Sequence, residues 1–459
     1  MRIDEHDDVE VNLETGHKIA LKNILKGENV IKYGFPIGHA TQHIEKGQIV
    51  HTHNLKTNLD DVVEYTYIPF DNNNKQIDCK KTFPGFIRED GRAGIRNDVW
   101  IVNTVGCVNK VAQRLAQKTG AESYAHPFGC SQLGDDMIYT QNILKAMVNH
   151  PNAGGILVMG LGCENNNIEL FREVLGDVCP ERVKFLNAQD TEDELEEGVK
   201  LIGELRRYAD TFKRTDVPIS ELVVGLKCGG SDGLSGITAN PLVGRVSDML
   251  ISCGGSTVLT EVPEMFGAET LLMQRCKDRE VFEKTVKLIN DFKLYFKRHN
   301  QVIYENPSPG NKAGGITTLE EKSLGCVQKG GKSVVVDVLD IGQSVIKNGL
   351  NLLNGPGNDI VAITNLMAAG AQIVLFTTGR GTPVGAPVPT VKIATNDRVF
   401  AQKKSWMDFN AGELLKGKSL DEVAAELLDY VMAVAGGRQT RNEINGYKEI
   451  SIFKDGIIL

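Results

Sequence analysis

The chain has 459 residues, of which 41% are hydrophobic and 24% charged, and a formal net charge of -8; this length predicts two or three globular domains. The acidic balance argues against a nucleic-acid partner, which needs a basic stripe, but allows a small anionic substrate in a local basic pocket. The chain has no apolar run near the roughly 20 residues of a membrane span and no secretory signal, so we expect a cytoplasmic protein without a membrane partner.

Residues 1–69 are expected to form a small β-rich domain that contains an internal repeat. The segments 20–30 and 40–50 share the pattern Ala-x-x-x-Ile-x-Lys-Gly-x-x-Val. Glycines at matching places predict matching turns, and the repeated Ile and Val predict the core positions of two similar halves.

A polar, proline-flanked stretch, residues 70–84, is expected to link this domain to the next. Residues 85–218 then alternate strand patterns with helix patterns, which predicts an α/β domain with a mainly parallel sheet. The continuous apolar runs 99–105 and 155–161 are typical of strands that are covered on both faces.

Residues 219–459 are expected to form a third domain, also of the α/β class. Apolar runs at 222–226, 333–339 and 373–378 predict its buried strands. An amphipathic pattern from about residue 278 to residue 299 predicts a long helix. The order of the strands in the sheet cannot be read from the sequence.

Two further helices are predicted with a capping box at the first turn. The apolar residues of segment 191–212 have helical spacing, and Thr191 and Glu194 at its start are three positions apart, as in a capping box. Ser419 and Glu422 have the same spacing before a helix that extends to about residue 435. In such a box each side chain bonds the backbone N–H of the other residue, which fixes the start of a helix.

Three strand ends or turns carry a cysteine directly after a glycine, and a fourth cysteine ends the first strand of the third domain. These residues are Cys107, Cys130, Cys163 and Cys228. Ligands collect at the carboxyl ends of parallel strands, so these thiols are expected to converge on one site, and thiolates suit iron, zinc or an iron–sulfur cluster. The alternative is that they are small core residues at tight turns.

The 9 cysteines are odd in number and scattered, so a disulfide framework is not expected.

Histidines and carboxylates supply the candidates for metal ligation or acid–base chemistry. His51 and His53 lie two residues apart, which on a strand turns both rings to one face. His126 precedes one of the Gly-Cys turns. Glu261 and Glu264 could ligate a metal or act as acid or base. The alternatives are a polar strand edge, a hydrogen-bonded structural histidine and ordinary surface carboxylates.

The segment "CGGSDGLSGITANP", residues 228–241, is rich in glycine and hydroxyl groups. Its backbone N–H groups could form an anion-binding nest. Ser231, Asp232 and Asn240 add polar groups for a metal or for sugar hydroxyls. The alternative is a tight loop between a strand and a helix.

Two long loops carry cationic side chains at places where α/β domains position binding residues. One loop contains Asn311 and Lys312, and the segment after the apolar strand at 373–378 contains Arg380 and Lys392. The guanidinium of arginine can donate two parallel hydrogen bonds to a carboxylate, so Arg380 is the leading candidate to bind the carboxylate of an acidic substrate. The alternative is a solvated loop with ordinary charges.

Long ordered blocks of the chain resemble the altronate/galactarate dehydratase family, which also includes sulfolactate sulfo-lyase. The blocks include "VHTHNLKTNL", "GIRNDVWIVNTVGCVN", "GCSQLGDD", "VMGLGCENNN", "CGGSDGLSGITANP" and "IYENPSPGNKAGGITTLE". The resemblance extends from about Gly16 to Leu459, and the repeat resembles the SAF domain that opens family members. The stretch before Gly16 is shorter than in the family, which leaves two alternatives: the small domain lacks a strand, or the start site is displaced.

The resemblance implies dehydration of D-altronate to 2-dehydro-3-deoxy-D-gluconate with an iron requirement, as Fe²⁺ or a labile Fe–S centre, with Mn²⁺ as a substitute. A proton must leave C2 beside a carboxylate, so the intermediate needs a metal and cationic groups to stabilise its charge. Arg380 and Lys312 are expected to hold the carboxylate, and the base is His53 or His126. The expected metal ligands are Cys107, Cys130, Cys163, Cys228 and His51. The expected catalytic residues are His53, His126, Lys312 and Glu164. The expected substrate-binding residues are Arg380, Lys392, Ser231, Asp232, Asn240 and Asn311.

Two other functions are kept open at this point. One is dehydration of another sugar acid, as in the galactarate branch. The other is a protein that binds a sugar acid or iron without catalysis, which loss of the cysteine and arginine set would favour; this sequence retains both. The expected partner is a small sugar acid, and a homo-oligomer is left open.

Overall fold

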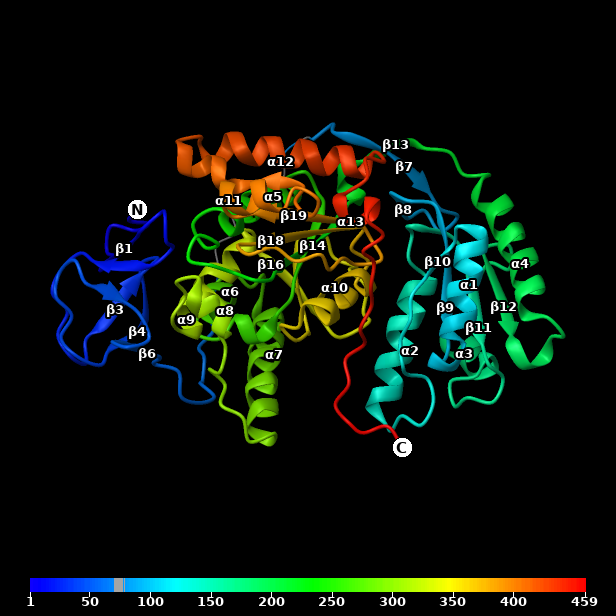
Figure 1. Ribbon diagram of the computed structural model, residues 1–459, viewed down its shortest axis with the longest axis horizontal. Helices are drawn as coiled ribbons and strands as arrows, with labels where there is room; N and C mark the ends of the chain where they lie inside the picture. The colour runs from blue at the N-terminus through cyan, green and yellow to red at the C-terminus, as the bar shows by residue number, and fades with distance from the viewer. Residues whose placement is uncertain (70–76, 78) are drawn as a thin grey trace.

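A small β domain and two α/β domains make up the computed structural model, which describes residues 1–69, 77 and 79–459 (Figure 1). Figure 1 places the third domain in the middle, with the β domain on one side and the second domain on the other. The predicted fold class is confirmed. Much of the predicted linker, residues 70–76 and 78, lies outside the described residues. None of the described helices combines the length and the apolar character needed to cross a membrane.

The β domain consists of two three-stranded sheets, ordered β1-β2-β5 and β3-β4-β6. Its strands are β1 (Val9–Val11), β2 (Lys18–Ala20), β3 (Asn29–Lys32), β4 (Phe35–Ala40), β5 (Ile49–Val50) and β6 (Leu55–Lys56). The repeat is confirmed: Ile24 and Ile44 exchange both backbone hydrogen bonds at 2.9 Å, and Gly27 and Gly47 have φ angles of 87° and 88°. A strand does form before Gly16, because β1 pairs with β2.

The second domain contains a parallel four-stranded sheet in the order β10-β9-β11-β12. Its strands are β9 (Asp98–Asn103), β10 (Glu122–Ser123), β11 (Ala153–Gly160) and β12 (Val183–Asn187). Its helices are η1 (Gly106–Val108), α1 (Asn109–Thr119), α2 (Asp135–Val148), α3 (Ile168–Leu175), η2 (Ala188–Asp190) and α4 (Glu194–Ala209). The two predicted strands are present. The capping box at Thr191 is wrong, because the Asp193 side chain caps α4 instead.

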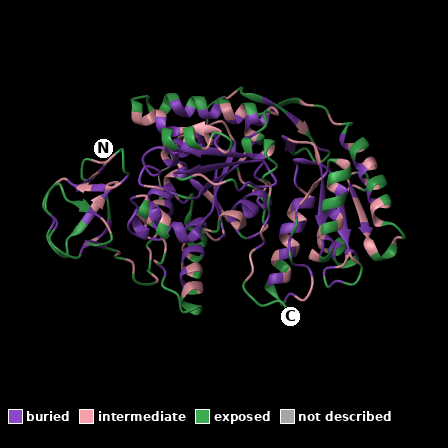
Figure 2. Ribbon diagram, viewed as in Figure 1, coloured by how far each residue is buried: buried purple, intermediate pink, exposed green. Residues whose placement is uncertain are grey.

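The third domain contains a parallel seven-stranded sheet in the order β16-β17-β15-β14-β18-β19-β20. Its strands are β14 (Val223–Cys228), β15 (Ser256–Leu259), β16 (Val335–Leu339), β17 (Leu350–Leu353), β18 (Ile373–Thr378), β19 (Thr390–Ala394) and β20 (Phe409–Asn410). Its helices are η3 (Ile219–Glu221), α5 (Ala239–Ser252), η4 (Val262–Glu264), α6 (Glu269–Met273), α7 (Arg279–Arg298), α8 (Pro309–Ala313), α9 (Leu319–Cys326), η5 (Val327–Gly330), α10 (Asp359–Ala368), α11 (Asp397–Gln402), η6 (Ala411–Lys416), α12 (Leu420–Ala435) and α13 (Arg441–Ile444). The predicted long helix is α7, and the capping box of Ser419 and Glu422 is confirmed at α12. Figure 2 shows the central strands of this sheet buried on both faces, as continuous apolar runs require.

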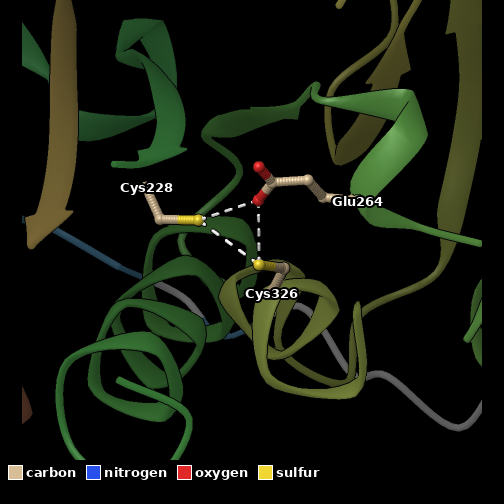
Figure 3. Close-up of side chains that lie close together, drawn as sticks. All are labelled: Cys228, Glu264 and Cys326. Carbon is tan, nitrogen blue, oxygen red and sulfur yellow. Dashed lines mark hydrogen bonds between the residues drawn. The ribbon is translucent and has the colours of Figure 1, made fainter. Parts of the chain in front are cut away.

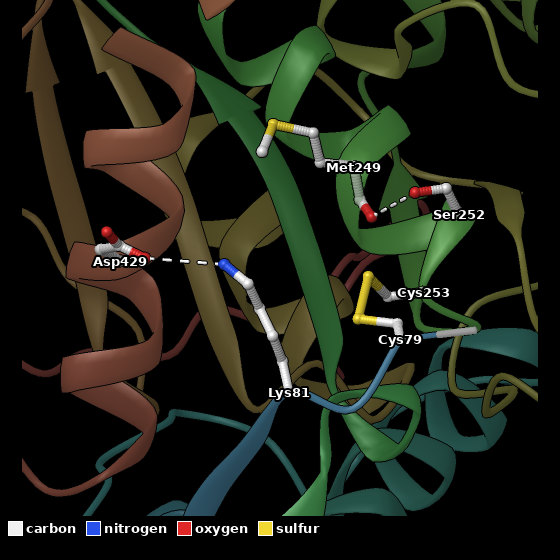
Figure 4. The surroundings of a disulfide bond; sticks show 6 residues. All are labelled: Cys79, Lys81, Met249, Ser252, Cys253 and Asp429. Carbon is white, nitrogen blue, oxygen red and sulfur yellow. Dashed lines mark hydrogen bonds and ion pairs between the residues drawn. A yellow bond between two sulfur atoms is a disulfide. The ribbon is translucent and has the colours of Figure 1, made fainter. Parts of the chain in front are cut away.

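A small antiparallel sheet connects the second and third domains, in the order β13-β7-β8. Its strands are β7 (Thr82–Ile87), β8 (Ala93–Gly94) and β13 (Thr215–Pro218). Just before β7, Cys79 forms a disulfide with Cys253 at the end of α5 (Figure 4). Lys81 and Asp429 add an ion pair at 3.7 Å beside it. The sequence predicts no disulfide framework and gives no sign of this single pair, which joins the chain before β7 to the third domain.

The sheets of the second and third domains meet near their amino ends. Gln372, directly before β18, donates to the carbonyl of Ala93 at 2.6 Å. Asn152, directly before β11, donates to the carbonyl of Gln372 at 3.0 Å. The strands β18 and β11 lead away from this contact for roughly 20 and 26 Å respectively, at about 3.3 Å per residue. The carboxyl edges of the two sheets, where α/β domains position their binding sites, therefore lie at two separate places in the folded molecule.

Candidate active site

A cavity of about 620 Å³ opens at the carboxyl edge of the third-domain sheet. It lies between the first hairpin of the β domain, the loop after β14, the loop after β18 and the helix α11. Its polar and charged lining side chains are Glu14, Thr15, Asp232, Arg380, Asn396, Asp397, Arg398, Gln402 and Lys416. This position agrees with the rule that ligands bind beyond the carboxyl ends of parallel strands. Of the predicted substrate-binding residues, Arg380 and Asp232 line this cavity.

Asp232 has the most ordered carboxylate in the cavity wall. One of its oxygens accepts from the Ser235 hydroxyl at 3.0 Å and from the Leu234 N–H at 3.2 Å. The other accepts from the Thr395 hydroxyl at 3.1 Å and from the Asn396 amide at 3.2 Å. Burial raises the pKa of Asp232 above its ordinary value, and the hydrogen bonds only partly oppose it. Its four acceptor positions are occupied, so Asp232 must exchange one of these donors to take up a proton, an exchange that its raised pKa favours.

Three cations line the same cavity beside the three carboxylates Glu14, Asp232 and Asp397, so the lining has no net charge but offers cationic partners for an acidic substrate. Arg380 is exposed, and one of its Nη atoms donates to the Gly310 carbonyl at 3.0 Å, which holds the guanidinium against α8. Arg398 and Lys416 line the opposite part of the wall from α11 and η6. Lys416 also pairs with Asp397 at 2.8 Å, so Arg380 and Arg398 are the better carboxylate partners.

The β domain closes one side of the cavity by direct backbone packing. A Cβ atom on Gly233 would lie 1.9 Å from the Gly16 carbonyl oxygen, so the two loops touch only because residue 233 has no side chain. His51 bonds the Lys312 carbonyl of α8 through Nε2 at 2.9 Å. His51 therefore joins the β domain to the third domain, and the predicted metal-ligand role does not fit it.

A fully buried ion triad joins the same two domains. The Glu321 carboxylate accepts from Lys18 at 2.8 Å and from Lys32 at 2.7 Å. Burial raises the pKa of Glu321, but the two ammonium groups more than offset this and lower it to about 2. Both lysines come from the β domain and the glutamate from α9, so the triad fixes the β domain over the cavity.

At the end of β14, just before the loop that lines the cavity, Cys228 forms a buried cluster with Glu264 and Cys326 (Figure 3). Among the described residues, this is the single group of three or more Cys, His, Asp and Glu side chains whose ligand atoms all lie within 4.8 Å. Two sulfurs and one carboxylate oxygen suit iron or zinc. The expectation that Cys228 joins the second-domain thiols is wrong, because its sulfur contacts Glu264 and Cys326 of the third domain instead.

The three Gly-Cys turns do lie in adjoining loops at the carboxyl edge of the second-domain sheet. Cys107 is exposed in η1, Cys163 is exposed after β11, and Cys130 bonds the Asn165 side chain at 3.3 Å. Their three sulfur atoms do not all lie within 4.8 Å of one another. The shared metal site of these thiols stays a prediction.

Two residues predicted as catalytic brace these second-domain loops instead. His126 is buried, with Nε2 2.8 Å from the Asn103 carbonyl and Nδ1 3.2 Å from the Phe128 nitrogen. With both ring nitrogens engaged, and its pKa lowered by burial, His126 has no free position for a substrate proton. Burial raises the pKa of Glu164, but hydrogen bonds from Thr104 and from the Gly162 N–H lower it overall, so this carboxylate stays ionised within its turn.

Two predicted substrate ligands are internal to the third domain. Lys392 is buried and donates to the Thr382 carbonyl at 2.9 Å, and burial lowers its pKa to about 7. Asn240 bonds the Gly325 carbonyl at 3.0 Å and the Thr377 hydroxyl at 2.6 Å. Their donors and acceptors are satisfied by the protein, so neither of them fits the substrate-binding role.

The remaining predicted residues lie around the cavity without lining it. The Asn311 amide donates to the Ser231 carbonyl at 2.9 Å, which ties α8 to the loop after β14. Lys312 follows on the same helix. His53 is exposed and lines a separate hollow of the β domain with His51. These four residues can shape the site, but none of them faces the cavity that contains Asp232 and Arg380.

The sequence prediction missed two functional candidates that the structure reveals. Cys326 was not selected, although Gly325-Cys326 repeats the dipeptide of the other three turns. Arg398 was not selected, because its place beside the cavity depends on how α11 follows β19. The first signal was present in the sequence, whereas the second comes from the tertiary structure.

Comparison with known proteins assigns a family to each part of the chain. The family model described as D-galactarate/altronate dehydratase, C-terminal, matches residues 219–458. The model described as D-galactarate dehydratase/altronate hydrolase, second domain, matches residues 85–210. The altronate/galactarate dehydratase SAF domain matches residues 2–58. These limits lie close to those of the three domains described above.

Curated relatives cover nearly the whole chain. It is 55% identical to the altronate dehydratase of Bacillus subtilis (strain 168), over 98% of this chain and 93% of the relative. It is 53% identical to the altronate dehydratase of Escherichia coli (strain K12), over 97% and 92%. The galactarate dehydratase (L-threo-forming) of the same Escherichia coli strain is 32% identical, over 93% and 87%.

Proposed function

The chain belongs to the D-galactarate/altronate dehydratase family, and on this basis we propose that it dehydrates D-altronate to 2-dehydro-3-deoxy-D-gluconate in the cytoplasm. Two altronate dehydratases support this substrate at more than 50% identity, whereas the galactarate dehydratase reaches 32%. The observation that carries the proposal is the cavity of about 620 Å³, which is lined both by the hydrogen-bonded Asp232 carboxylate and by the cations Arg380 and Arg398.

The side chains of the cavity fit the proton movements of this reaction. Arg380 and Arg398 would bind the substrate carboxylate and neutralise part of the charge that develops on it. Asp232 would then accept the C2 proton. The C3 hydroxyl would take up this proton and leave as water, and the resulting enol would lose the proton of its C2 hydroxyl and gain one at C3 to become the 2-keto acid. Asp232 replaces the two histidines as the proposed base, because neither His53 nor His126 lines this cavity.

Iron dependence is a further part of the proposal. The two thiols and one carboxylate of the buried cluster are a donor set that suits ferrous iron. When bound, iron would supply Lewis-acid stabilisation of the negative charge on the substrate oxygens. Asp232 and Arg380 would keep the roles given above.

Substrate choice is the direct test of the proposed function. We expect the purified protein, loaded anaerobically with Fe²⁺, to form a 2-keto-3-deoxy acid from D-altronate without NAD or ATP. Product is measured by a colorimetric assay for 2-keto-3-deoxy acids and by mass spectrometry. Dehydration of galactarate with no turnover of altronate would contradict the proposal and favour the galactarate branch.

The variant Arg380→Lys should show whether binding of the substrate carboxylate depends on the bidentate geometry of the guanidinium or only on its positive charge. Lysine keeps the positive charge but loses the planar fork of arginine, so we expect a loss of about 2 kcal/mol or more of transition-state stabilisation. This corresponds to a fall of roughly thirtyfold in kcat/KM on altronate. Lys404→Arg, on a nearby segment that does not line the cavity, is the control, and unchanged kcat/KM in Arg380→Lys would remove Arg380 from the site.

A further inference from the structure

Three sequence-distant elements bring Cys228, Glu264 and Cys326 together in the interior of the third domain. Cys228 ends β14, Glu264 ends η4 and Cys326 ends α9. All three side chains are buried, with exposed fractions of 1%, 4% and 4%. Figure 3 shows both sulfur atoms and the carboxylate pointing toward one another. Such convergence needs a reason, because burying two thiols against a carboxylate gains little packing.

The three ligand atoms form a nearly equilateral triangle. Glu264 Oε2 lies 3.4 Å from Cys228 Sγ and 3.1 Å from Cys326 Sγ, and the two sulfurs are 3.3 Å apart. A point equidistant from atoms at these separations lies about 1.9 Å from each, just inside the ~2.0–2.3 Å of metal–oxygen and metal–sulfur bonds. An ion placed slightly out of the plane would therefore reach all three atoms, as on one face of a tetrahedron.

The surrounding charges also suit a divalent cation. Three lysines and three carboxylates surround the thiols: Lys227, Lys322, Lys329, Glu261, Glu264 and Asp359. These six charges cancel, so two metal-bound thiolates would leave an excess of two negative charges. One divalent ion restores neutrality in this buried region, where unbalanced charge is costly.

The lysines do not fill the centre of the triangle. Lys329 approaches Cys228 Sγ at 2.9 Å and also pairs with Glu261 at 3.1 Å. Lys322 approaches the other oxygen of Glu264, Oε1, at 2.8 Å, which leaves Oε2 directed at the sulfurs. These contacts act on the outer side of the ligands and orient them, as groups around a metal site commonly do.

We propose that Cys228, Glu264 and Cys326 bind one divalent iron ion. The inference deepens the proposed function, because it gives the proposed iron a ligand set in the third domain. Three protein ligands are the number typical of catalytic rather than structural sites, in which the remaining position holds water or substrate. The exposed thiols of the second domain are then not the ligands of this ion.

Cobalt substitution of the full-length protein tests the ligands without relying on activity. The protein is stripped of metal, reduced and titrated with Co²⁺ under anaerobic conditions, with metal content and absorption spectra recorded. We expect one Co²⁺ per chain and a near-ultraviolet band from thiolate-to-cobalt charge transfer. Absence of the band at a stoichiometric metal content would overturn the proposal, and so would absence of stoichiometric uptake.

Four single variants then identify the ligands. Cys326→Ser should bind Co²⁺ at least a hundredfold more weakly and lose most of the band. Glu264→Gln should keep the band, because both thiols remain, but bind more weakly. Cys276→Ser is the matched control: this cysteine is also buried, but its Sγ contacts the Thr285 hydroxyl at 3.4 Å outside the cluster, so uptake and band should be unchanged. A band that persists in Cys326→Ser and disappears in Cys107→Ser would overturn the proposal in favour of the second-domain thiols.

The same preparations separate the site from the proposed reaction. Thermal unfolding without metal confirms that each variant is folded, and Glu264→Gln provides a second test if Cys326→Ser has a lower Tm. If the wild-type protein binds cobalt through these thiols but does not convert altronate when it is loaded with iron, the proposed function is contradicted and the metal site is supported. If altronate is fully turned over with no metal bound at these residues, the metal site is contradicted and the proposed function is supported.

Discussion

Asp232→Asn is expected to lower kcat on altronate by about a thousandfold, the typical contribution of a positioned general base. Asparagine has the shape of aspartate but cannot accept the C2 proton at neutral pH. The change should act on kcat more than on KM, because the cations Arg380 and Arg398 still bind the substrate carboxylate. Steady-state kinetics of the iron-loaded protein measure both parameters.

The pH dependence gives a second readout of the same residue. Because burial raises the pKa of Asp232, kcat/KM of the unmodified protein should fall with decreasing pH at a value above the ordinary aspartate pKa of about 4. The residual activity of Asp232→Asn should lack this acidic limb. Asp421→Asn, at an exposed pair with Arg245, is the control and should leave kinetics unchanged. An unaltered kcat in Asp232→Asn would assign the base to another residue.

Most of the fold could be predicted because its signals are local. The buried strands β9, β11, β14 and β18 are continuous apolar runs, and the parallel class follows from their alternation with helices. The repeat in the β domain was visible as matching Ile, Gly and Val positions. Contacts between domains were not predictable, because Gln372 and Asn152 give no sign in the sequence that they meet.

The candidate site was predictable in residue type but not in arrangement. Arg380 and Asp232 follow strands that end at one sheet edge, so the rule for parallel sheets places both correctly. His126 and Lys392 failed because burial and backbone hydrogen bonds, which decide their chemistry, cannot be read from their neighbours in the sequence. Cys228 was placed with the wrong partners because the Gly-Cys pattern does not show which sheet edge each turn faces.

The joint between the β domain and the third domain should be the most sensitive point of the structure outside the cavity. Glu321 neutralises Lys18 and Lys32, and all three side chains are buried. Glu321→Gln leaves two buried ammonium groups without a counter-charge, which typically costs roughly 3–5 kcal/mol. We expect a lower Tm and faster hydrogen exchange in residues 1–58, measured by calorimetry and mass spectrometry.

The pH dependence of this joint has a definite sign. The pKa of Glu321 is lowered from 4.5 to about 2 in the folded protein, so its stabilising contribution is present above pH 4.5 and is lost as the pH falls toward 2. The shift corresponds to about 3 kcal/mol, in agreement with the cost expected for the variant. Glu321→Gln should therefore show less acid destabilisation over this range than the unmodified protein.

Replacing the whole triad distinguishes charge pairing from packing. Lys18→Met, Lys32→Met and Glu321→Met together remove every buried charge of the triad, but they also remove the hydrogen bonds to the Gly315 carbonyl and to the hydroxyl and N–H of Thr317, so stability should recover in part. If the triple variant is as unstable as Glu321→Gln, hydrogen bonding and packing at the joint rather than charge balance control its stability. If Glu321→Gln alone leaves both Tm and hydrogen exchange unchanged, the triad does not hold the β domain over the cavity.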